Sequence, residues 1–217
     1  MTPFRRQPEP PFWPAKERRW LGLAPGWGKR DPLNDWRHRR RSLASWFHEL
    51  VREPSEPRMC AYCDGSLHEQ SRETVDHFLP EHEFPELALS WHNLFPACDR
   101  CNSTYKRERW SCRIVRPDTD PVEELFDIDE LSGWLRPRAK LDWTTRVNVR
   151  LTIRVFRLNE RHRCEGRKRV MQEMRNAWKR DPTTLARDNS TLEQRAAQGP
   201  YRFVAWRYLQ ALRALDP

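Results

Sequence analysis

CAYC at residues 60–63 and CDRC at residues 98–101 are two CxxC pairs, and they enclose TVDHFLP at 74–80 and WHNLFPA at 91–97. Each pair places two thiolates on one ion through a tight turn. Four sulfurs form the closed tetrahedron in which proteins hold structural zinc. We therefore predict a structural zinc site made of Cys60, Cys63, Cys98 and Cys101.

The segment between the pairs is 34 residues long, which exceeds the length typical of a compact zinc ribbon. A folded unit must therefore lie inside the loop that the zinc closes, and zinc of this type contributes about 10 kcal/mol to folding. Residues 74–80 and 91–97 are polar runs with apolar flanks, which suits two short strands, and the second run leads directly into residues typical of a helix. The expected order is strand, loop, strand, helix.

Together, CxxC, DHFxP, WxNL and CxxCN with a following lysine resemble the HNH (ββα-metal, His-Me finger) endonuclease family over residues 60–107. More narrowly, HFxPE, FPEL, the W-x-N-L element and CNSxYK resemble the HNH subunit of Septu-type anti-phage systems and its retron-associated relatives, over residues 58–170. The resemblance implies an α+β fold with a zinc-stapled ββα-metal core embedded in a mostly helical small domain. It also implies an endonuclease of anti-phage defence, held in a complex by an ABC-type ATPase.

Hydrolysis of a phosphodiester needs a base that deprotonates water, and His77 suits this task because an imidazole titrates near neutral pH. By resemblance, Asp76 and Asn102 hold a hard divalent cation, Mg2+ or Mn2+, that neutralises charge on the phosphate. Asn93 matches the family residue that ties the loop and orients the histidine. Neighbouring strand residues point to opposite faces, so Asp76 and His77 are expected to serve the ion and the water separately.

Several polar residues near the motif have less specific signals. Lys106 would either reach a phosphate or be solvated on the helix surface. His68, His82 and His92 are not motif positions and are expected at the surface or behind the site, with His82 the strongest exception. The spacing of the two remaining cysteines predicts ordinary buried thiols; they are Cys112 and Cys164.

The composition favours a polyanionic partner. Lys plus Arg number 40 and Asp plus Glu number 31, so the net charge is +9, although a basic soluble protein without such a partner is the alternative. No apolar run approaches the roughly 18 residues needed to span a bilayer, and the start of the chain lacks a hydrophobic signal core, so we expect a cytoplasmic protein. In a reducing compartment, six cysteines indicate metal ligands or thiols rather than disulfides.

The flanks of the predicted core divide into three parts. Residues 1–33 are expected to form a Pro/Arg-rich arm that is extended on the domain or on a partner, or else disordered. Residues 34–57 contain a predicted basic amphipathic helix from Asn34 to Arg52. The core covers residues 58–112. Residues 113–217 hold an acidic connector, a strand and C-terminal helices that pack on the core or on a partner.

Within residues 113–217, the alternating apolar residues of 146–155 predict a strand whose other face carries Arg146, Arg150 and Arg154. That arginine face would either be solvated or bind phosphate. Asn159 is the predicted N-cap of a basic helix that runs to about Arg180. A last helix is expected from about Tyr201 to Leu215. The acidic residues between 117 and 137 should face away from nucleic acid, or contact a basic partner.

Two other functions remain open at this point. The same chemistry would act on RNA, such as tRNA, because the metal and the histidine act on a phosphodiester in either polymer. Alternatively, the chain is a non-catalytic zinc-dependent nucleic-acid-binding or scaffold protein, since two CxxC pairs alone are typical of binding modules.

Overall fold

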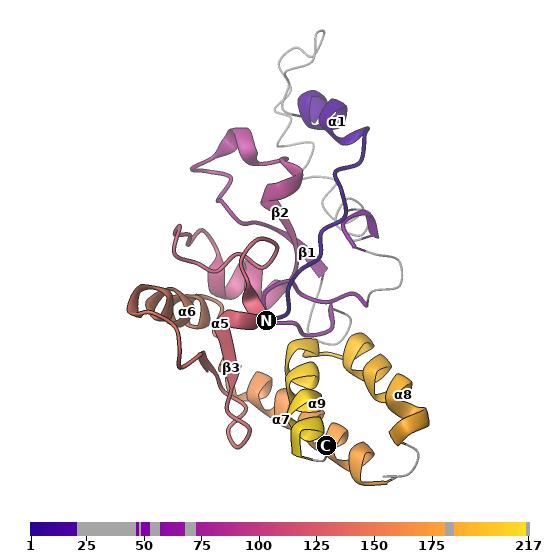
Figure 1. Ribbon diagram of the computed structural model, residues 1–217. Helices are drawn as coiled ribbons and strands as arrows, with labels where there is room; N and C mark the ends of the chain where they lie inside the picture. Colours follow the sequence, from indigo (N-terminus) through magenta and orange to yellow (C-terminus); the bar gives the residue numbers. More distant parts are fainter. Residues whose placement is uncertain (21–46, 48, 53–56, 68–72, 181–184, 216–217) are drawn as a thin grey trace.

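A computed structural model describes residues 1–20, 47, 49–52, 57–67, 73–180 and 185–215 of the chain. Its architecture is α+β, as expected: the described residues form two small antiparallel sheets together with helices (Figure 1). The helix predicted from Asn34 to Arg52 lies almost entirely outside these residues. Only residues 47, 49 and 50 of its range are described as helical.

The first sheet holds the DH and WxNL motifs. Strand β1 (Glu73–His77) pairs antiparallel with β2 (Leu94–Cys98), in a register that sets His77 opposite Leu94. Two single-turn 3-10 helices, η1 (Pro85–Leu87) and η2 (Trp91–Asn93), form part of the connection between the strands. The helix that follows β2 is η3 (Arg100–Lys106), and it is a π-helix rather than an α-helix. The predicted order of strand, loop, strand and helix is confirmed.

A second hairpin follows the core. The short helix α5 (Val122–Leu125) leads into β3 (Phe126–Ile128), which pairs with β4 (Leu135–Pro137). Gly133 in the hairpin turn has a φ of 73°, and a Cβ atom there would lie 2.4 Å from the carbonyl oxygen of Cys164. Only glycine suits this position, since it combines left-handed backbone geometry with close approach to another backbone.

Residues 146–155 form part of helix α6 (Trp143–Val155), so the predicted strand is wrong. The β-branched residues do alternate, but Val149, Thr152 and Val155 are also spaced by three, and these residues are the buried ones. Asp142 caps the helix by accepting a hydrogen bond from the Thr145 backbone nitrogen. Packing of one helical face and this cap therefore outweigh the strand propensity of the segment.

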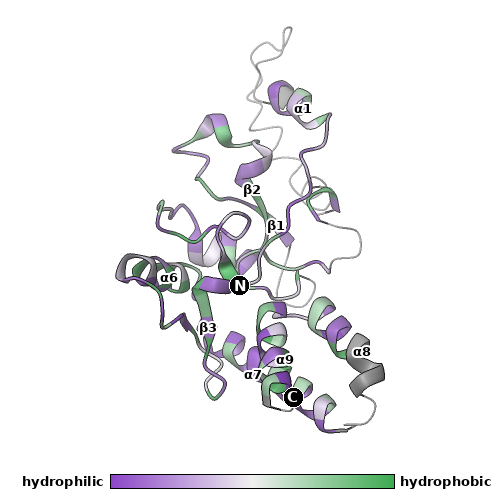
Figure 2. Ribbon diagram, in the orientation of Figure 1, coloured by the Kyte–Doolittle hydropathy of each residue, from purple (hydrophilic) through white to green (hydrophobic). Residues whose placement is uncertain are grey.

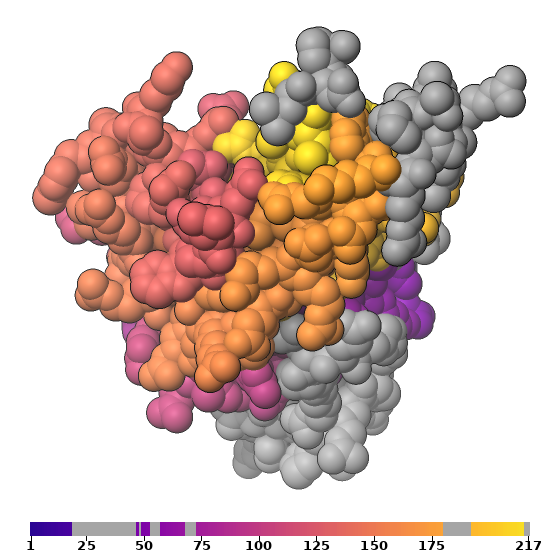
Figure 3. Space-filling model, turned by 90° about the horizontal axis from the view of Figure 1, so that it is seen from below, coloured from indigo at the N-terminus to yellow at the C-terminus, as the bar shows by residue number. Residues whose placement is uncertain are grey.

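The C-terminal part consists of α7 (Arg161–Arg180), α8 (Leu185–Gln198) and α9 (Arg202–Leu215), which lie together in Figure 1. Helices near the predicted bounds of α7 and α9 are confirmed, with Met171, Met174 and Leu209 buried between them. Helix α8 has no counterpart among the predicted elements. Figure 3 shows the orange residues around α7 lying across the middle of the face seen from below.

Asn159 does not act as the predicted N-cap of α7. Its side chain instead accepts a hydrogen bond from the Leu135 nitrogen and donates one to the Leu135 oxygen, at 2.8 and 2.9 Å. The first turn of α7 bonds to the carbonyl of Glu160, which accepts from the backbone nitrogens of Arg163 and Cys164. Asn159 therefore fastens the start of α7 to the second hairpin.

The beginning of the chain lies on the core and is not extended throughout. Residues 1–10 have no regular structure, whereas α1 (Trp13–Trp20) is helical. Arg6 donates to the carbonyl oxygens of Trp91 and Leu94, at 2.6 and 2.8 Å, and pairs with Asp118. The arm of residues 1–33 is expected on the domain or on a partner, and its described part lies on the domain.

The buried apolar residues among those described form one large cluster and one smaller one. The large cluster runs from the cysteines through the hairpins to the C-terminal helices. The smaller one joins Trp13, Phe47 and Val51 to Trp91 and Leu94. Figure 2 shows β2 in green, the colour of hydrophobic residues, and the whole strand is buried. This buried strand gives the site a rigid base.

Candidate functional site

The four predicted zinc ligands come together. Cys60 and Cys63 lie in a turn closed by the Met59–Ser66 bridge, Cys98 ends β2 and Cys101 lies in the first turn of η3. All four are buried, and their sulfur atoms lie within 4.8 Å of one another. Zinc with sulfur ligands at 2.3 Å sets sulfurs about 3.8 Å apart in a tetrahedron, and the Cys63 and Cys98 sulfurs are 3.9 Å apart. The donor set and its spacing fit a structural zinc ion.

Sequence reasoning missed a buried arginine beside this cluster. The Nη2 atom of Arg163, from the first turn of α7, donates to the Cys101 sulfur at 3.1 Å. Burial acts to lower the pKa of Arg163, but the neighbouring cysteines outweigh it and raise the pKa, so the guanidinium stays charged. The residue is 62 positions from Cys101, and nothing in the local sequence marks it.

His77 lies at the end of β1, and its Nδ1 atom lies 3.9 Å from a carboxylate oxygen of Glu81. Its Nε2 atom lies 2.7 Å from the carbonyl oxygen of Ala88. A carbonyl only accepts, so Nε2 carries the proton and Nδ1 carries the lone pair. Burial lowers the pKa of His77, against the opposing effects of Asp76 and Glu81, and this favours the neutral form that is able to accept a proton.

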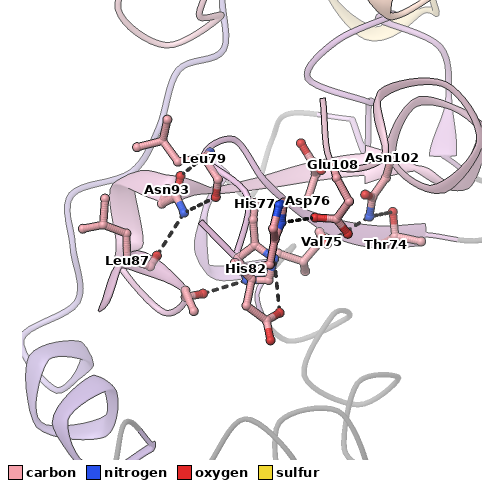
Figure 4. A network of polar contacts seen from close by, with 12 residues as sticks. Thr74, Val75, Asp76, His77, Leu79, His82, Leu87, Asn93, Asn102 and Glu108 are labelled. Atoms are coloured by element: carbon pink, nitrogen blue, oxygen red, sulfur yellow. Dashed lines mark hydrogen bonds and ion pairs between the residues drawn. The ribbon is translucent and has the colours of Figure 1, made fainter. Parts of the chain in front are cut away.

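Asn93 fixes the loop around this histidine, as Figure 4 shows. Its Oδ1 atom accepts from the Leu79 nitrogen at 2.8 Å, and its Nδ2 atom donates to the carbonyls of Leu79 and Leu87 at 3.0 Å. These bonds join the end of β1 to the turn that carries Ala88. Asn93 thus holds the carbonyl that sets the tautomer of His77.

Asp76 is only 2% exposed and is already engaged. Its Oδ2 atom accepts from the Tyr62 hydroxyl, and its Oδ1 atom lies 3.1 Å from the ammonium of Lys106, which also donates to the His77 carbonyl at 2.6 Å. Burial raises the pKa of Asp76, although Lys106 and Tyr62 act in the opposite direction. Lys106 is therefore neither a solvated surface lysine nor free to reach a phosphate.

Asn102 extends from η3 toward β1. Its Nδ2 atom donates to the Thr74 hydroxyl and to the Val75 carbonyl, each at 3.1 Å, which leaves its Oδ1 atom as a possible ligand for a cation. The π-turn is closed by the Arg107 nitrogen and the Asn102 oxygen, at 2.7 Å. With this wider turn, both Asn102 and Lys106 contact β1.

A hard divalent cation fits this arrangement less well than zinc fits the cysteines. Asn102 offers an amide oxygen, but the Asp76 carboxylate is buried and paired with Lys106. In the described part of the chain, the four cysteines are the one group of His, Cys, Asp or Glu residues with metal-ligand spacing. An ion held by Asp76 would have to displace Lys106 from this carboxylate.

The other predicted positions have mixed outcomes. His82 is exposed and lies between Glu108, at 2.6 Å, and Glu83, at 3.4 Å; Figure 4 labels His82 and Glu108. His92 is exposed at the surface, and His68 lies outside the described residues. Of the remaining cysteines, Cys164 is buried as predicted, whereas Cys112 is exposed because it lies in the turns that follow η3.

Residues 60–108 match the HNH endonuclease family. Two curated relatives are both named Septu protein PtuB. The first, from Bacillus thuringiensis, is 48% identical over 44 residues, covering 20% of this chain and 17% of the relative. The second, from Bacillus mycoides (strain KBAB4), is 25% identical over 142 residues, covering 53% of this chain and 48% of the relative. The chain thus spans at most about half of either relative. None of the described helices is long and apolar enough to cross a membrane.

Proposed function

We propose that the protein is a metal-dependent endonuclease that hydrolyses phosphodiester bonds, with DNA favoured as substrate. The observation that carries this proposal is the fixed tautomer of His77, whose Nε2 atom is held by the Ala88 carbonyl. A neutral imidazole with its Nδ1 lone pair free of that bond suits a general base. The match of residues 60–108 to HNH endonucleases supports the same chemistry.

In the proposed reaction, His77 takes a proton from a water molecule at Nδ1 while the water oxygen bonds to phosphorus. The bond from phosphorus to the bridging oxygen breaks, and that oxygen leaves as an alkoxide that takes a proton from solvent. Asn93 keeps the imidazole in place, and the proposed ligands of the ion are Asp76 and Asn102. When bound, a magnesium or manganese ion supplies positive charge that stabilises the phosphate and the departing oxygen. To hold the ion, the Asp76 carboxylate must exchange its contact with Lys106 for a contact with the ion.

Exposed arginines next to the site support a nucleic acid as the substrate. Arg107, Arg109 and Arg113 lie on the segment that follows η3, and their side chains are exposed. The same segment is joined to the loop that follows His77 through the pair formed by Glu108 and His82. Cationic side chains at this position would attract phosphates without reading sequence.

We further propose that the nuclease acts in anti-phage defence, held and regulated by an ABC-type ATPase. Support comes from the likeness to proteins named Septu protein PtuB. Regulation by a partner also suits the site, because the affinity of arginines for phosphates is independent of sequence and would be hazardous in an unregulated nuclease.

A cleavage assay tests the reaction. Zinc-loaded protein, alone and as the complex purified with its genomic neighbours, is incubated with supercoiled plasmid and with total RNA, in Mg2+, in Mn2+ or without added metal. We expect nicked or linear plasmid only when a divalent ion is added, with zinc per chain unchanged. Cleavage of RNA alone would favour the RNA alternative. Binding of both polymers with cleavage of neither would favour the scaffold alternative and contradict the proposal.

A further inference from the structure

Arg163 is a buried cation that lies against the cysteine cluster. Its side chain is fully buried, with an exposed fraction of 0%. Its Nη1 atom donates to the Phe156 carbonyl at 2.6 Å, its Nη2 atom donates to the Cys101 sulfur at 3.1 Å, and its guanidinium lies 5.1 Å from the centre of the Tyr105 ring. A buried cation requires compensation, and carbonyl and ring contacts alone supply little of it.

The cysteine cluster supplies the opposite charge. Four thiolates carry −4 and a zinc ion carries +2, so the loaded centre has a net charge of −2. A dianion surrounded by buried residues is costly unless a cation contacts it. Arginine suits this position better than lysine because its guanidinium is always charged and donates in a fixed fork.

We infer that Arg163 is the charge-compensating partner of the four-thiolate zinc centre, so that retention of the metal depends on helix α7 although α7 supplies no ligand. The inference rests on the zinc centre and not on the proposed nuclease activity. It makes α7 and the region of residues 60–101 one cooperative unit. The four cysteines of that region bind the metal, and Arg163 compensates the negative charge of the loaded centre.

The chain offers a buried control and an exposed control. Arg167, one helical turn further on, is also buried, but its guanidinium donates to the carbonyls of Gly133 and Leu158. Arg161 is almost fully exposed and pairs with Glu165. Loss of Arg167 should therefore weaken the fold without acting on the sulfurs, and loss of Arg161 should do neither.

The test measures the apparent zinc affinity of the full chain by competition with a chromophoric chelator, with folding checked by circular dichroism. Arg163→Met should bind zinc about 10-fold to 100-fold more weakly, the size seen when partners of metal ligands are removed. Arg163→Lys should recover part of this loss because it keeps the charge. The zinc affinities of Arg161→Met and of the folded fraction of Arg167→Met should remain within about threefold of that of the parent.

Each of the following results would overturn the inference. The first is parental zinc affinity in Arg163→Met. The second is an equal loss in Arg163→Met and Arg167→Met, which would show general destabilisation. The third is a parent chain that binds no zinc, which would remove the centre itself. If Arg163→Met does not fold, the test uses Arg163→Lys. A zinc affinity of Arg163→Lys more than about 100-fold below that of the parent would then contradict a role based on charge. Nuclease activity is not part of the readout, so the proposed function stands or falls separately.

Discussion

Lys106 and Asp76 form an ion pair with almost no access to water, since their side chains are 1% and 3% exposed. Removing one member of such a pair leaves the other charged and buried. We expect Lys106→Met to lower the free energy of unfolding by about 3 to 5 kcal/mol, measured by urea unfolding of zinc-loaded protein. Lys140→Met, at an exposed position, is the control. Equal stability of the two variants would show that the pair contributes nothing to the fold.

The residues of the site are easier to predict from the sequence than their surroundings. The zinc ligands, His77 and Asn93 follow from short motifs in which spacing carries the information. The partners of Lys106 and Arg163 lie about 30 and 62 positions away, so they depend on how η3 and α7 pack. No local pattern encodes such packing, and for this reason the sequence allows a surface position for Lys106 and gives no sign of the role of Arg163.

The segment of residues 107–113 is the element that we expect to contact phosphates. The variant in which Arg107, Arg109 and Arg113 are all changed to Gln should bind a DNA duplex more weakly and with a weaker dependence on salt. The log–log slope should fall by about 0.9 for each phosphate that the variant no longer neutralises. Fluorescence anisotropy in a His77→Ala background, over about 50 to 200 mM salt, measures this slope without cleavage.

A matched control removes the same charge from helix α7. Lys168, Arg169 and Lys179 are exposed there, and changing all three to Gln lowers the net charge equally. If both triple variants reduce the slope to the same extent, the effect comes from the overall charge and the segment has no special role.

Helix α6 shows why some elements could not be predicted. Its alternating apolar residues match a strand template, and the same segment also matches a helix with Val149, Thr152 and Val155 inward. The choice is made by tertiary contacts, such as the hydrogen bond from the Val115 nitrogen to the Thr152 hydroxyl. The strands β1 and β2 are easier to predict because their motifs are short and β2 ends at Cys98, the first residue of the second cysteine pair.

At the scale of the whole molecule, the region of residues 60–108 is contacted from both directions along the chain. Residues 1–10 contact β2 and η2 through Arg6, and α7 contacts the cysteine cluster through Arg163. The predicted clustering of the four cysteines in an α+β core is confirmed, and the cluster fits a zinc ion. Whether the flanks pack on that core or on a partner does not follow from the sequence, since composition and periodicity do not encode contacts between distant segments.

The central claim is that His77 is the base of a nuclease, and one comparison tests it most directly. Cleavage of duplex DNA is measured for the parent, for His77→Ala and for His92→Ala, with zinc per chain determined on the same samples. His77→Ala should keep its zinc and lose at least about 100-fold in rate, the usual contribution of a general base, while His92→Ala should cut like the parent. Cleavage by folded, zinc-loaded His77→Ala at the rate of His92→Ala would contradict the account.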